Sequence, residues 1–166
     1  MILGMNLQTF TLVHVLLSLV GIGSGLIVGF GLLGGKRMNG WTVLFLVTTV
    51  LTSATGFLFP VDHLLSSHIV AILSLVALVI AIVSRYTFYM AGAWRTTYGV
   101  GAVVALYFNC FVGVVQGFEK VPALKALAPT QEEPPFLVAQ LVVLAIFLAL
   151  GIVAAKRFRG AAMLPA

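Results

Sequence analysis

The sequence predicts an all-α fold, an integral membrane helical bundle of five transmembrane helices. Of its 166 residues, 61% are hydrophobic and only 8% are charged, with a mean hydropathy of +1.18. A soluble domain carries roughly 25% charged residues, so a water-soluble protein is excluded. Five separate runs reach the length of about 20 mostly apolar residues that a spanning helix needs. None of them alternates as the strands of a β-barrel do.

The five predicted spans form a single transmembrane domain that covers residues 1–166. They are residues 10–33, 41–60, 64–84, 98–118 and 136–155. The first is interpreted as a retained helix, because no Lys or Arg precedes it and no clean cleavage site follows it. The third is interrupted only by Ser74 between positions 69 and 83, and the fifth has Gln140 as its only strongly polar member. The longest connection, residues 119–135, contains four prolines and is predicted to be a loop.

The charged residues orient the predicted bundle. Seven of the nine basic residues fall on one side of the spans: Lys36, Arg37, Arg85, Arg95, Lys156, Arg157 and Arg159. The other side holds all four acidic residues: Asp62, Glu119, Glu132 and Glu133. Cytoplasmic loops carry an excess of Lys and Arg, so we predict that the N-terminus is outside, the C-terminus cytoplasmic and the proline-rich loop periplasmic. Since topology explains the basic excess, the lipid bilayer is the expected partner and nucleic acid is not.

Polar side chains of all five spans are predicted to fall in one layer near the outer helix ends. His14, Thr55, His68, Gln116 and Gln140 each lie within about 3–6 Å of a predicted end, at 1.5 Å per residue. Asn109, Gln116 and Glu119 share one face of the fourth span. In lipid such groups usually turn inward. We therefore predict an outward-facing pocket lined by His14, His68, Thr55, Asn109, Gln116, Glu119 and Gln140, with Asp62 and His63 just above it.

The pair of histidines raises the hypothesis of one bound haem b and a role in electron transfer. Membrane haem is commonly held by two axial histidines, and His14 and His68 come from different spans at matching depth. They would be metal ligands only if haem is bound, with His63 near the propionates. The stripe of Gly21, Gly25 and Gly29 would leave room for the ring.

Two other functions stay open. In a proton-coupled or small-solute transporter, the same histidines would exchange protons with Asp62 or Glu119, although the predicted inner half has no histidine, carboxylate or amide to line a continuous pore. A non-catalytic subunit or assembly factor would pack into a homo-oligomer or a larger membrane complex, for which the glycine stripe is suited. No recognisable catalytic motif is present, so an enzymatic activity is neither predicted nor excluded.

Two short stretches carry a resemblance. Residues 52–60, TSATGFLFP, and residues 128–136, APTQEEPPF, resemble a group of small, uncharacterised bacterial polytopic membrane proteins. The resemblance implies a multi-pass protein of the bacterial inner membrane. It implies no activity and no site residues.

Overall fold

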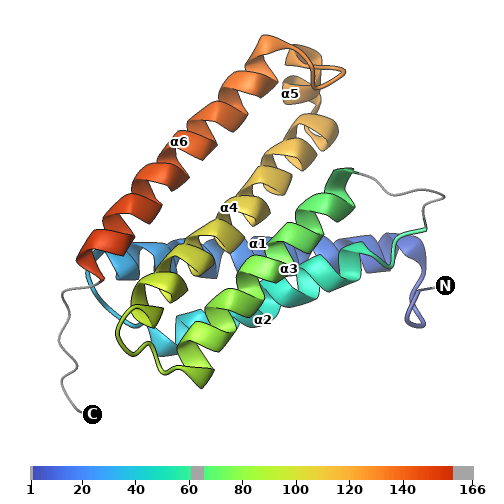
Figure 1. The fold of residues 1–166 in the computed structure, drawn as a ribbon. Helices are drawn as coiled ribbons and strands as arrows, with labels where there is room; N and C mark the ends of the chain where they lie inside the picture. The colour runs from blue at the N-terminus through green and yellow to red at the C-terminus, as the bar shows by residue number, and fades with distance from the viewer. Residues whose placement is uncertain (1, 61–65, 159–166) are drawn as a thin grey trace.

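The computed structural model describes residues 2–60 and 66–158, and within these ranges the chain forms helices and short connections without a strand (Figure 1). The helices are α1 (Leu7–Leu33), α2 (Asn39–Gly56), α3 (Ser66–Ile82), the π-helical turn η1 (Val83–Thr87), α4 (Trp94–Lys120), α5 (Pro122–Leu127) and α6 (Pro134–Arg157). This confirms the all-α class that the composition predicts.

Four of the described helices are long and apolar enough to cross a membrane: Leu7–Leu33, Ser67–Thr87, Trp94–Lys120 and Pro134–Arg157. They coincide with the first, third, fourth and fifth predicted spans. α2 coincides with the second but is not among the four, because five threonines lower its hydropathy. Its 18 residues give a length of about 27 Å, close to the ~30 Å hydrocarbon core. The fifth crossing stays a prediction.

Helix ends differ from the predicted ones by a few residues, for local reasons. α1 begins three residues early because the Asn6 side chain accepts a hydrogen bond from the Thr9 amide at 2.8 Å and caps the helix. α2 ends at Gly56, four residues before Pro60, because Pro60 has no N–H to bond to the Gly56 carbonyl and its ring would clash with that carbonyl in a continuing helix. α6 begins on Pro134 and Pro135, whose missing N–H groups cost nothing in a first turn.

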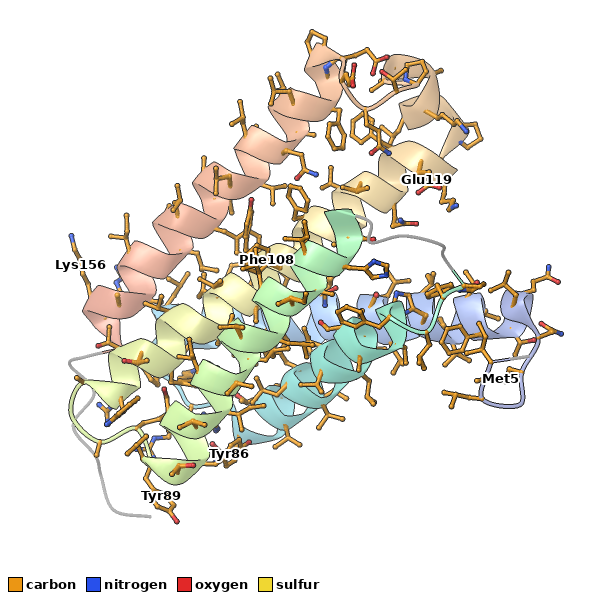
Figure 2. The ribbon with its side chains drawn as sticks, turned by 45° about the vertical axis from the view of Figure 1, so that its right-hand side comes forward. Met5, Tyr86, Tyr89, Phe108, Glu119 and Lys156 are labelled. Carbon is orange, nitrogen blue, oxygen red and sulfur yellow. The ribbon has the colours of Figure 1, made fainter. Side chains whose placement is uncertain are left out.

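Helices α1 to α4 form a closed ring of contacts, and α6 packs outside this ring against α4 and α1 (Figure 1). The α1–α2 connection, the η1–α4 connection and the end of α6 lie at one end of the bundle. The beginning of α1 and the α5 segment lie at the other. Figure 2 agrees, since Tyr86, Tyr89 and Lys156 mark the first end, and Met5 and Glu119 mark the second. We call the first the basic end, because Lys36, Arg85 and Lys156 lie there, and the second the acidic end, because Glu119 lies there.

The glycine stripe of α1 is used inside the protomer. A Cβ atom added at Gly25 would lie 2.5 Å from Leu106 Cδ1 of α4 and 2.8 Å from Phe45 Cδ2 of α2. One added at Gly21 would lie 2.9 Å from Asn109 Nδ2. These glycines therefore let α1 approach its neighbours closely, as small residues do between membrane helices.

We expect Gly25→Ala to lower the free energy of unfolding by about 1–3 kcal/mol, the usual cost of overpacking a filled core. Leu106 and Phe45 are themselves buried and have no free space to move into. Gly23 is the matched control on the same helix, because an added Cβ there meets nothing within 4 Å. Unfolding in detergent, followed by circular dichroism, measures both; equal stability of the two variants would contradict the tight contact.

Candidate functional site

A small cavity lies between α1, α2, α3 and α4, toward the acidic end. Its volume is about 80 Å³. Its polar lining residues are His14, Thr52, Ser53, Ser67, Ser74 and Asn109. It extends from Gly56 and Ser67, at the adjoining ends of α2 and α3, to Phe108 in the middle of α4. The cavity therefore lies in the half of the bundle that carries the acidic residues.

His14 is held by a hydrogen bond that fixes its tautomer. Its Nδ1 atom lies 2.8 Å from Thr55 Oγ1. The Thr55 hydroxyl has one hydrogen, which it donates to the Leu51 carbonyl oxygen at 2.7 Å. We infer that Thr55 accepts from His14, which places the proton of the neutral imidazole on Nδ1. The remaining ring nitrogen, Nε2, is left as a hydrogen-bond acceptor or base.

Two lining residues of the cavity, Thr52 and Asn109, carry a buried polar atom without a hydrogen-bond partner. Among the described residues, Thr49 Oγ1 and Gln140 Oε1 have none either, and Asn109 Nδ2 lies against Gly21 and Thr49. Asn109 is only 7% exposed. Leaving such a group unsatisfied costs about 1–3 kcal/mol. Six of the eleven lining residues have polar side chains, while most of the wall area is apolar, and the cavity has room for a few water molecules.

The structure brings together only part of the predicted pocket. His14, Thr55 and Asn109 meet at or beside the cavity. His68 is buried but stacks on Phe57, with ring centroids 5.3 Å apart, and is not among the lining residues. Asp62 and His63 lie outside the described residues.

The other three residues of the predicted pocket, Gln116, Glu119 and Gln140, lie away from the cavity. Gln116 and Glu119 are exposed on α4 and hydrogen-bond to each other at 3.3 Å. Gln140 is buried between α6 and α4, where its Nε2 donates to the Phe111 carbonyl oxygen at 3.3 Å. It lies apart from the cavity because α6 packs outside the ring that α1 to α4 form.

Several lining residues are not in the predicted pocket. Thr52, Ser53, Ser67 and Ser74 all border the cavity. Hydroxyl side chains carry little sequence signal, since most serines and threonines in membrane helices bond to their own backbone. The spacing of Thr52 and Thr55, which share a face of α2, was the one available hint.

The fit of a haem to this cavity is poor. Sites for ligands of drug size measure roughly 300–1,000 Å³, several times the volume of the cavity. Only one of the two proposed ligands, His14, lines it. The arrangement therefore gives the haem hypothesis no support.

The cavity is closed toward the basic end. Below Asn109 the side chains of Leu106, Phe45 and Val28 are buried in the hydrophobic core, and Leu106 and Phe45 pack against Gly25. No continuous polar path crosses the described part of the bundle. The site is therefore one-sided.

No family model, curated protein or solved structure matches this chain. The resemblance of residues 52–60 and 128–136 to bacterial membrane proteins accordingly stays a prediction.

We expect the neutral form of His14 to carry its proton on Nδ1, because Thr55 accepts that hydrogen. ¹⁵N spectra of protein labelled in histidine report the tautomer directly, and His14→Gln assigns the signal. Thr55→Val should remove the preference for Nδ1–H, whereas the control Thr52→Val should keep it. An Nε2–H tautomer in the unsubstituted protein would show that Thr55 donates to His14 Nδ1 instead.

Proposed function

We propose that this chain is a multi-pass membrane protein that binds a small uncharged polar solute in an outward-facing site beside His14, as a small-solute transporter does. The observation that supports this function is the cavity of about 80 Å³, to whose lining His14, Asn109 and four hydroxyl side chains contribute. Its volume suits a solute of a few non-hydrogen atoms, or two or three waters at roughly 30 Å³ each.

The lining favours an uncharged solute over an ion. The polar side chains that line the cavity are the amide of Asn109, the imidazole of His14 and hydroxyl groups, which can hydrogen-bond without carrying a charge. No Asp, Glu, Lys or Arg borders the cavity among the described residues. Burying an ion without an opposite charge is far more costly than burying a hydrogen-bonded neutral group, so a molecule such as urea fits this chemistry better.

The closed basic half favours a site that alternates rather than an open channel. A solute bound beside His14 would leave on the far side only after α1 and α4 part at Gly25 and Leu106. Small sliding movements between packed helices are one known way in which such a contact opens. Transport by alternating access is consistent with that contact.

The proposed topology has five crossings, with the N-terminus outside and the C-terminus in the cytoplasm of a bacterial inner membrane. Two features support it. α2 runs beside α1 and ends near the level at which α1 begins (Figure 1). Lys36, Arg85 and Lys156 belong to segments gathered at the basic end, which the positive-inside rule places in the cytoplasm.

A cysteine placed in the cavity should react with a water-soluble thiol reagent added from outside. The one cysteine of the chain is first removed by Cys110→Ser. In that background, Ser74→Cys should react at least about tenfold faster than Leu73→Cys, because a thiol facing lipid does not ionise. Ser74 lines the cavity, and its neighbour Leu73 is exposed on the outer surface of the bundle. Mass spectrometry of intact cells treated with a membrane-impermeant methanethiosulfonate measures both rates.

The same experiment tests the orientation. Ser67→Cys, at the mouth of the cavity, should react in intact cells and not in inside-out vesicles. Equal rates for Ser74→Cys and Leu73→Cys would contradict a hydrated site, and reaction of Ser67→Cys only in inside-out vesicles would reverse the topology.

Transport itself is tested with urea as the probe. Proteoliposomes should re-swell in a urea gradient faster than protein-free liposomes, as measured by stopped-flow light scattering. His14→Leu and Asn109→Leu should each remove this difference because each replaces a polar lining residue with an apolar one. Thr11→Val, on the exposed side of α1, is the control and should leave the faster re-swelling unchanged. Identical rates with and without the unsubstituted protein would contradict urea transport.

A further inference from the structure

Arg85 is a buried cation at the basic end. It is 7% exposed and lies in η1, the π-helical turn that follows α3. Its Nη2 donates to Asn39 Oδ1 at 2.6 Å and to the Arg37 carbonyl oxygen at 3.4 Å. Its guanidinium also lies 5.0 Å from the centre of the Tyr98 ring. All of these partners are uncharged.

No acidic side chain lies at this end of the described bundle. Glu119, Glu132 and Glu133 follow α4 or precede α6, at the acidic end. The salt bridge that the described residues form, between Lys120 and Glu119, is there too. Lys36, Arg37, Arg95, Lys156 and Arg157 add their charges to that of Arg85 at the basic end. The charge of this end is therefore not balanced by described side chains.

The surface above Arg85 has the composition of a membrane interface. Lys36 and Arg37 are exposed in the connection between α1 and α2. Exposed aromatic side chains flank them, Trp41 in the first turn of α2 and Tyr86 in η1, where aromatic residues meet lipid headgroups. Exposed apolar side chains continue from there along α2 and α3: Val43, Val47, Val79 and Ile80.

We propose that this surface binds the phosphodiester headgroup of an anionic glycerophospholipid, held by Lys36 and Arg37 above the buried Arg85. A phosphate there would supply a negative charge that no described side chain provides at this end. Basic pockets between membrane helices bind anionic headgroups in this way. The apolar side chains of α2 and α3 would lie along the acyl chains, which favours a lipid over a free anion.

The two tryptophans of the chain, Trp41 and Trp94, allow a direct test. Both lie at the basic end, and Trp94→Phe leaves Trp41 as the single fluorophore beside the proposed site. The protein is reconstituted in phosphatidylcholine bilayers that contain increasing amounts of either brominated phosphatidylglycerol or brominated phosphatidylcholine. Bromine on the acyl chains quenches a tryptophan that it contacts. Half-maximal quenching should need at least roughly fivefold less brominated phosphatidylglycerol than brominated phosphatidylcholine. A fivefold ratio is the effect of one basic side chain near a charged headgroup.

The variant Lys36→Gln/Arg37→Gln should lose this preference. Both residues are exposed, so unfolding temperatures should match those of the parent. Lys120→Gln/Lys125→Gln removes two charges at the acidic end and should keep the preference. Equal quenching by the two brominated lipids, or a preference that survives Lys36→Gln/Arg37→Gln, would overturn the site. Loss of the preference in millimolar inorganic phosphate would assign the site to a free anion and overturn the lipid proposal.

Discussion

The hydrocarbon interior offers no water to hydrogen-bond with, and the rest of this structure depends on that constraint. Backbone groups in lipid must be paired within the chain, which leaves the helix as the available conformation for these apolar segments. The same demand falls on side chains. Ser24, Thr48 and Ser84 donate to carbonyl oxygens four residues earlier in their own helices, at 2.6–2.7 Å. Thr49 Oγ1, Thr52 Oγ1, Asn109 Nδ2 and Gln140 Oε1 depart from this pattern among the described residues, and two of these residues, Thr52 and Asn109, border the cavity.

Charged side chains are stabilised differently at the two ends of the bundle. At the acidic end, exposed groups pair locally, as Lys120 and Glu119 do. At the basic end, the Arg85 guanidinium is turned into the protein and held by a side-chain amide, a carbonyl oxygen and aromatic rings. The π-helical turn is what redirects Arg85, because an extra residue in the turn rotates the following side chains relative to α3. The protein thus has hydrogen-bonding chemistry toward one end of the bundle and positive charge toward the other.

Much of the fold could be predicted because hydropathy acts over whole segments. Four predicted spans coincide with helices of sufficient length and apolarity. α2 shows the limit of that reasoning: five threonines make it less apolar, yet its buried hydroxyls, such as those of Thr42 and Thr48, face neighbouring helices rather than lipid. Hydropathy counts residues without regard to the direction in which they point.

The candidate site could likewise be predicted only in part. Depth along a helix follows from position in the sequence, so the sequence by itself determined that His14 and Asn109 lie in or near the half of the bundle that carries the acidic residues. Which polar groups meet depends on how each helix is rotated and which helices are neighbours. Gln140 has a suitable depth but belongs to α6, which packs outside the ring, and His68 turns to Phe57. The pairing of His14 with Thr55, and with it the position of the imidazole proton, follows from a contact between residues 41 positions apart. Only packing decides such contacts, because lipid is as apolar as leucine and gives a helix no preferred neighbour.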